Sequence, residues 1–131
     1  MTRTNVDGGG KLEATYGYSR AVRVGNVIKV SGTCAVDENG APFAAGDPAG
    51  QAIRCYEIIG SALKAAGAEL GNIVISRVYL KNISDAEAVG TAHGQLFGEV
   101  KPAMTLLEVS GLVHDDFLVE IECEAVVGDE V

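Results

Sequence analysis

The segment that most restricts the fold lies near the C-terminus, where apolar and acidic side chains alternate. Within residues 117–125, Glu120, Glu122 and Glu124 take every second position, and apolar residues take the positions between them. Successive side chains of a β-strand point to opposite faces, so this pattern predicts a strand whose apolar face packs under helices. Glutamate is rarely buried without a partner, so the acidic face must be solvated, paired or part of an interface.

The acidic face has two interpretations at this point. The first is a solvated strand surface without a special role. The second is that one of the carboxylates acts as a general acid or base in a cleft between subunits. The alternation alone does not separate them.

Other strands are predicted from β-branched runs. Residues 21–32 form two such runs around Gly25-Asn26, which is typical of a β-hairpin. Residues 73–80 and 103–109 follow the same pattern, and the acidic segment extends the last strand over residues 117–127.

Two helices are predicted between these strands. Asp47-Pro48 opens the first, which Gly67 closes, and its apolar residues recur at intervals of three and four. A capping-box pattern from Ser84 to Glu87 opens the second helix, which ends at Gly98. The second helix is expected to turn Val89, Ala92, Leu96 and Phe97 inward. The order β-β-α-β-α-β-β predicts an α+β fold, with a mixed sheet and both helices on one face.

The length of 131 residues fits a single domain over residues 13–131, preceded by a flexible, glycine-rich arm over residues 1–12. We expect a cytoplasmic protein, because no apolar run is long enough to span a membrane and no secretory signal is recognisable. A net charge of −8 argues against general nucleic-acid binding. The odd, widely spaced cysteines indicate neither a metal site nor a cofactor.

An ordered set of short motifs carries a resemblance over residues 16 to 127. The set resembles the RidA (YjgF/YER057c/UK114) family, and that resemblance implies a chorismate-mutase-like fold. It also implies a homotrimer with a barrel-like core and small-molecule pockets at the subunit interfaces. The motifs are Gly17-Tyr18-Ser19, Val30-Ser31-Gly32, Asp47 to Gln51, Ala65-Ala66-Gly67, Pro102-Ala103-x-Thr105-x-x-Glu108 and Val119-Glu120-Ile121-Glu122.

The chain departs from the family pattern at one important position. Deaminases of the family bind the substrate carboxylate with an arginine in Pro-Ala-Arg-Ser, and here Met104 takes its place. A guanidinium offers a carboxylate two charge-assisted hydrogen bonds, whereas a thioether is only a weak acceptor. Leu106 stands where many relatives have cysteine, and Gly90 where many have asparagine. The pocket is therefore expected to be more apolar than in a typical family deaminase.

Other family features are retained. By resemblance, Glu120 corresponds to the pocket glutamate that assists a water molecule, Tyr18 to a tyrosine of the pocket wall, and Gly32 to the segment that lines the cavity. Cys34 follows closely and can reach the same pocket, although a single cysteine is more often a small core residue.

Two further residues have open interpretations. His93 is either a partly buried helix residue or a catalytic group of the pocket. Arg20, two residues after Tyr18, would share its face on an extended chain and partly replace the missing arginine, or else pair with surface carboxylates.

These observations leave two hypotheses for function. The first is a trimeric imine or enamine hydrolase, a deaminase with an atypical substrate. The second is a non-catalytic trimer that binds an apolar small molecule or a protein partner through the same clefts.

Overall fold

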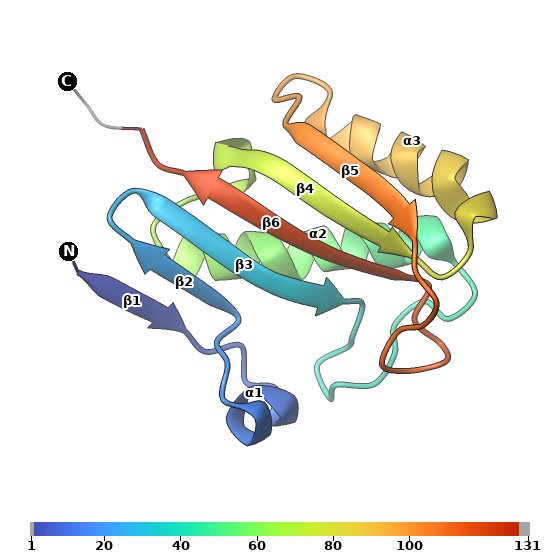
Figure 1. Ribbon diagram of the computed structural model, residues 1–131, viewed down its shortest axis with the longest axis horizontal. Coiled ribbons are helices and arrows are strands. Elements are labelled where there is room, and N and C mark those ends of the chain that lie inside the picture. The colour runs from blue at the N-terminus through green and yellow to red at the C-terminus, as the bar shows by residue number, and fades with distance from the viewer. Residues whose placement is uncertain (1, 129–131) are drawn as a thin grey trace.

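The computed structural model describes residues 2–128, which form a mixed sheet with two long helices on one side (Figure 1). Neighbouring strands follow the order β1-β2-β3-β6-β4-β5, in which only β4 and β5 run parallel to each other. The strands are β1 (Arg3–Val6), β2 (Ala21–Val24), β3 (Val27–Cys34), β4 (Ile73–Leu80), β5 (Ala103–Glu108) and β6 (Val119–Val126). The helices are α1 (Lys11–Tyr16), α2 (Pro48–Ala65) and α3 (Ala86–Phe97), with 3-10 turns η1 (Leu70–Asn72) and η2 (Ile83–Asp85).

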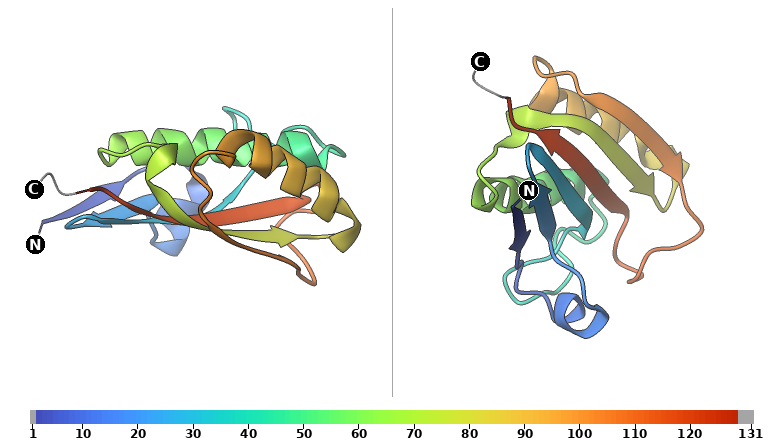
Figure 2. Two further views of the ribbon diagram at one scale, coloured as in Figure 1. Left: turned by 90° about the horizontal axis from the view of Figure 1, so that it is seen from above. Right: turned by 60° about the vertical axis from the view of Figure 1, so that its left-hand side comes forward.

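The helices α2 and α3 cover the same face of the sheet, as predicted (Figure 2). Strand β6 lies at the centre of the sheet, and its apolar side chains Val119, Ile121 and Cys123 are buried beneath the helices. Helices α2 and α3 leave the other face of the sheet uncovered, and the three glutamates of β6 point to it. The alternation of apolar and acidic residues in this strand therefore corresponds to its two faces, one buried under the helices and one uncovered.

Helix α2 begins and ends where the sequence predicts. The Asp47 carboxylate accepts a hydrogen bond from the Gly50 amide at 2.9 Å, and Pro48 occupies the first turn. Gly67 follows the helix with a φ of 87°, a left-handed conformation that favours glycine. The predicted apolar face is buried throughout: Ala52, Cys55, Tyr56, Ile59, Ala62, Leu63 and Ala66.

The start of α3 differs from the prediction. Ser84 belongs to the turn η2, and the helix is capped at Asp85 without a side-chain hydrogen bond, so the predicted capping box does not form. Val89, Ala92 and Phe97 are buried as expected, but Leu96 is exposed. Helix α3 lies at the edge of the helical layer and covers only a narrow part of the sheet. A narrow apolar face is therefore sufficient, and Leu96 lies outside it.

The N-terminal segment is not the loose arm that its glycines suggested. Strand β1 pairs antiparallel with β2, Val6 is buried, and the Arg20 amide donates to the Val6 carbonyl at 2.8 Å. Helix α1 follows and ends at Gly17, which has a φ of 76°. The free edge of β2 provides backbone partners that satisfy the amides and carbonyls of residues 3–6.

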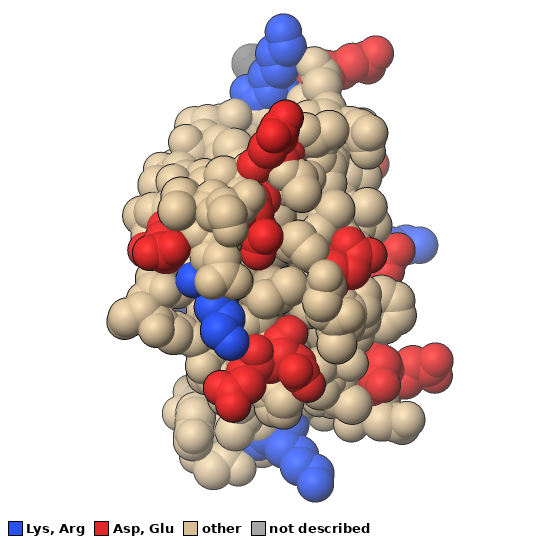
Figure 3. Space-filling view, turned by 90° about the vertical axis from the view of Figure 1, so that its right-hand side faces the viewer, with Lys and Arg blue, Asp and Glu red and all other residues tan. Residues whose placement is uncertain are grey.

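At the end of the molecule that lies to the right in Figure 1, most of the charged side chains on the surface are carboxylates (Figure 3). Basic side chains are fewer there, in agreement with the net charge of −8. None of the helices in the described residues has the length and apolar character that crossing a membrane requires.

Candidate functional site

Glu120 lies in the middle of the open face of the sheet, between two partner strands. Its backbone pairs with Cys34 of β3 on one side and with Tyr79 of β4 on the other. The Cys34 thiol donates to the Glu120 carboxylate, with 3.5 Å between Sγ and Oε1. Among residues 2–128 this is its one side-chain hydrogen bond, and it forms no salt bridge there. The carboxylate is therefore held in place but not neutralised.

Gly32 makes room for this carboxylate. The pairing of β3 with β6 is irregular between Val30 and Thr33, as at a β-bulge. A Cβ atom on Gly32 would overlap the Oε2 atom of Glu120, so the carboxylate lies directly over the glycine backbone. The bulge and the missing side chain together position the Glu120 carboxylate against the main chain of β3.

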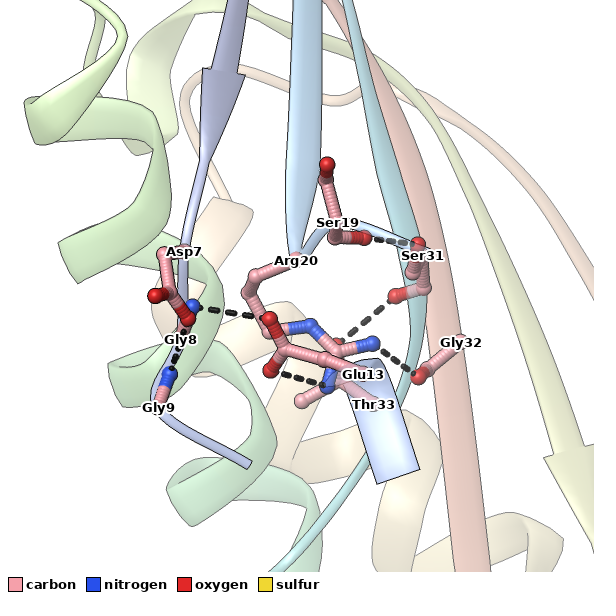
Figure 4. Close-up of polar contacts among 9 residues, drawn as sticks. All are labelled: Asp7, Gly8, Gly9, Glu13, Ser19, Arg20, Ser31, Gly32 and Thr33. Carbon is pink, nitrogen blue, oxygen red and sulfur yellow. Dashed lines mark hydrogen bonds and ion pairs between the residues drawn. The ribbon is translucent and has the colours of Figure 1, made fainter. Parts of the chain in front are cut away.

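Arg20 contacts the same backbone segment of β3 (Figure 4). Its Nη2 donates to the Gly32 carbonyl at 2.6 Å, and its guanidinium carbon lies 5.6 Å from the centre of the Tyr18 ring. Ser31 donates from its hydroxyl to the Ser19 carbonyl at 2.7 Å and ties the two segments together. The structure thus brings Tyr18, Arg20, Gly32, Cys34 and Glu120 to one place, which we call the Gly32 cluster.

The other two glutamates of β6 are paired. Glu124 accepts from Lys29 at 2.9 Å and from Arg77 at 2.6 Å, and these two hydrogen bonds lower the pKa of its carboxyl group. Glu122 accepts a short hydrogen bond from the Tyr79 hydroxyl, which raises the pKa of that tyrosine. Glu124 is therefore paired with cations and Glu122 with a neutral hydroxyl, whereas the Glu120 carboxylate has only the Cys34 thiol as a side-chain partner among the described residues.

Met104 and Leu106 lie on β5, away from the Gly32 cluster. They pair with Ser76 and Val78 of β4, both of which are buried on the helix side of the sheet. Residues paired across two strands share a face, so Met104 and Leu106 lie on the face opposite to Glu120. Met104 and Leu106 therefore do not form a pocket with Glu120 within one chain.

Gly90 and His93 lie on α3, which runs alongside β5 (Figure 1 and Figure 2). A Cβ on Gly90 would meet no atom within 4 Å, so the helix surface is open there. The His93 ring is buried, with its centre 4.7 Å from that of Phe97 and 5.8 Å from that of Tyr56. Burial lowers the pKa of His93, and its position corresponds to the core interpretation of this residue.

The three cysteines have the properties of protonated thiols. Burial raises the pKa of Cys34, and the nearby Glu120 carboxylate adds to the effect. Burial also raises the pKa of Cys55 to about 12 and that of Cys123 to about 11. Nucleophilic attack by cysteine requires the thiolate, so these positions do not favour a cysteine nucleophile.

One further residue near the cluster was not predicted from the sequence. Glu13 of α1 is buried, accepts a hydrogen bond from the Gly8 amide at 2.9 Å, and has its Oε2 atom 4.0 Å from Nη1 of Arg20 (Figure 4). A hollow of about 450 Å³ lies beside it, bordered by Glu13, Tyr18 and Ser19 among others. The only local signal was the run Gly8-Gly9-Gly10, which is equally typical of a flexible segment.

Residues 9–127 match the family described as endoribonuclease L-PSP. The chain belongs to this family. A crystal structure of a YjgF/YER057c/UK114 family member from Mycobacterium tuberculosis is similar, with a TM-score of 0.87 and 38% sequence identity, over 96% of this chain and 100% of that one. The resemblance and the α+β fold predicted from the motifs are therefore confirmed.

Some relatives in the family carry names that state a reaction. The 3-aminoacrylate deaminase RutC of Acinetobacter baylyi is 33% identical over 79% of this chain and 82% of its own length. The human 2-iminobutanoate/2-iminopropanoate deaminase is 32% identical over 85% of this chain and 80% of its own length. Both names describe removal of nitrogen from an enamine or an imine.

Proposed function

We propose that this protein hydrolyses an imine or enamine in pockets formed between the subunits of a homotrimer. The observation that carries the proposal is the Glu120 carboxylate, which lies over Gly32 without a cationic partner in the described chain. A carboxylate that is held but not neutralised is able to accept a proton from water. The deaminase names of two relatives support the same class of reaction.

The reaction balances with water alone. Water adds to the carbon of the C=N bond while Glu120 accepts one of its protons. Glu120 returns that proton to the nitrogen, the hydroxyl proton of the adduct also moves to the nitrogen, the C–N bond breaks, and ammonia and a carbonyl compound leave. An enamine first takes up a proton on carbon and becomes the imine. Glu120 is the proposed catalytic residue, and Cys34 orients its carboxylate by the hydrogen bond described above.

The proposed pocket combines residues of two copies of the chain. Within one copy, Met104 and Leu106 lie on the face of the sheet opposite to Glu120, so a single chain offers only half of the predicted site. Met104 is 37% exposed on an edge strand that has an unpaired side. In the trimer, Met104, Leu106 and the open surface around Gly90 would face the Gly32 cluster of a neighbouring copy.

The substrate is expected to differ from that of family members with the arginine. Met104 cannot form the paired, charge-assisted hydrogen bonds through which a guanidinium holds a carboxylate. An apolar wall of Met104 and Leu106 favours a substrate with an apolar group at that position. The proposal is therefore a deaminase with a different substrate preference.

The test uses imines formed in situ from amino acids by an amino-acid oxidase, with small, bulky and decarboxylated examples. Imine decay is measured above the uncatalysed rate. We expect wild-type activity on at least one imine and a loss of about 100-fold or more in Glu120→Gln, the lower range for general acid–base catalysis. Glu122→Gln is the matched control, because Glu122 lies on the same face but is bonded to Tyr79.

Two outcomes bear on the proposal directly. Met104→Arg is expected to raise activity on small 2-imino acids more than on decarboxylated imines. Absence of hydrolysis across the whole panel, with a folded and assembled protein, contradicts the enzyme proposal.

A second candidate function is a non-catalytic binder that uses the same clefts. Met104, Leu106 and Gly90 favour it, because each provides an inert group where relatives have a polar or reactive one. A tightly bound molecule retained through purification and detected by native mass spectrometry would support the binder, since ligand retention of this kind is unusual for an enzyme in turnover.

A further inference from the structure

The asparagines of this chain differ in the residue that follows each of them. Asn39 precedes Gly40, and every other asparagine precedes valine or isoleucine. This difference matters because the backbone nitrogen of the following residue is able to attack the carbonyl carbon of the asparagine side chain. A β-branched side chain crowds that nitrogen, whereas glycine leaves it open. The asparagines that precede a β-branched residue are Asn5, Asn26, Asn72 and Asn82.

The Asn39 side chain is also accessible and unconstrained. Both Asn39 and Gly40 are exposed, and a Cβ atom added to Gly40 would meet no atom within 4 Å. The Asn39 side chain forms no hydrogen bond with the part of the chain that the structure describes. By contrast, the Asn72 side chain is held in place, because its Oδ1 atom accepts from the Glu69 amide at 2.9 Å. Asn39 thus combines an open neighbour with a free side chain.

Gly40 closes a tight turn that begins at Asp37. Its φ of 82° is in the left-handed region, and its amide donates to the Asp37 carbonyl at 3.0 Å. The Asp37 carboxylate accepts from the amides of Asn39 and Ala41 at 2.8 and 3.0 Å. The Gly40 nitrogen must leave the Asp37 carbonyl before it attacks Asn39. This is one hydrogen bond on an exposed turn, where water replaces it at small cost.

We propose that Asn39 is the site at which this protein deamidates, through a cyclic imide closed by the Gly40 nitrogen. That nitrogen loses its proton and bonds to the Cγ atom of Asn39, and the side-chain amide leaves as ammonia. Water then opens the ring at either of its two carbonyl groups. The products are aspartate and isoaspartate, and in the latter the main chain runs through the former side chain. One neutral amide becomes one carboxylate, which makes the net charge of −8 more negative.

The modification is expected to loosen the contact between this turn and helix α2. Arg54 of α2 holds both arms of the turn, since its Nε donates to the Val36 carbonyl at 2.8 Å and its guanidinium carbon lies 5.7 Å from the centre of the Phe43 ring. Val36 also pairs with Pro42 across the turn. Isoaspartate adds a methylene group to the main chain between these arms and a charge beside the Asp37 carboxylate. The Val36–Pro42 pairing is therefore expected to open.

The experiment follows the purified full chain during incubation at mildly alkaline pH. Ion-exchange chromatography separates the more acidic product, and peptide mapping by mass spectrometry locates the amide that was exchanged for an acid. We expect position 39 to react at least about tenfold faster than any other asparagine, because β-branched neighbours crowd the attacking nitrogen at the other positions. Both aspartate and isoaspartate are expected at position 39, since the ring opens at either carbonyl group.

Asn39→Gln is expected to remove the acidic product, because glutamine would have to close a larger and less favourable ring. Asn82→Gln is the matched control, since Asn82 is also exposed but precedes Ile83, and it should leave the rate unchanged. Circular dichroism verifies the fold of both variants. A faster reaction at another asparagine overturns the inference, as does an unmodified protein under conditions in which a short peptide with the same turn reacts. Formation of aspartate without isoaspartate contradicts the cyclic route.

Discussion

His93 shows how one buried side chain links stability to pH. Its ring packs between Tyr56 and Phe97, and its Nε2 atom is buried without a hydrogen-bond partner in the described chain. The neutral ring suits this apolar environment, and burial lowers the pKa of His93 below its ordinary value of 6.5. The unfolded chain, in which the ring is solvated, therefore takes up a proton more readily than the folded protein.

The free energy of unfolding should fall as the pH drops below about 6.5, and continue to fall until the pKa of His93 in the folded protein is reached. The contribution of this residue is at most about 1.4 kcal/mol per pH unit. Urea unfolding at pH 7.5 and 5.5 measures it. His93→Gln should reduce the loss, whereas His114→Gln, which changes the other histidine in an exposed loop, should not. Equal losses in both variants would contradict this assignment.

Some of the candidate site was predictable at the level of single residues. Tyr18 and Arg20 share a face because they are two positions apart, and the motif placed Gly32 near Glu120. The burial of Glu13 was not predictable, because it depends on a loop of glycines folding back over one helical turn. The separation of Met104 from Glu120 required knowledge of strand order, which residue patterns do not contain.

At the level of elements, the two helix starts behave differently although each has aspartate at the cap. Asp47 accepts a hydrogen bond from Gly50 at the start of α2, while Asp85 forms no such bond at the start of α3. Only the first satisfies one of the free amides that every helix start contains. The stability of α2 therefore depends on its cap more than that of α3 does.

Asp47→Ala should lower the free energy of unfolding by about 1 kcal/mol, the usual cost of losing an N-cap hydrogen bond. Asp85→Ala is the matched control and should cost less, since only its favourable charge near the helix start is lost. Chemical denaturation of both variants and wild type gives the comparison. A larger loss for Asp85→Ala would contradict the role of the Asp47 side chain.

The strands and helices with strong periodicity were predicted from the sequence, and the weak ones were not. Strand β6 and helix α2 combine apolar periodicity with clear end signals, so their positions agree closely with the prediction. Strand β1 and helix α1 lie in a polar, glycine-rich segment without such a pattern. They form because β2 offers a free edge, which is a property of the tertiary structure.

At the scale of the whole molecule, the sheet has one face covered by helices and one face without them. The uncovered face combines the paired charges of β6 and β4 with the exposed apolar side chain of Leu107. Leu107 pairs with Tyr79, so it belongs to the face that carries Glu120. An amphipathic face of this kind is suited to association between copies.

Sedimentation should give a particle of about three times the 13.5 kDa mass of the chain. Leu107→Glu should weaken the assembly, because it adds a carboxylate to an already acidic face. Val113→Glu adds the same charge at an exposed loop position and should leave the mass unchanged. A wild-type monomer at micromolar concentration would contradict the trimer and, with it, the shared pocket.

The close approach of Gly32 and Glu120 also has a consequence for how the sequence can vary. A side chain at position 32 would push the flexible end of Glu120 aside and leave the fold intact. The effect would be a displaced carboxylate and not an unfolded protein. The two positions are therefore expected to change together during evolution. Homologues with a larger residue in place of Gly32 should have a shorter side chain in place of Glu120, and should therefore lack the carboxylate that accepts the proton.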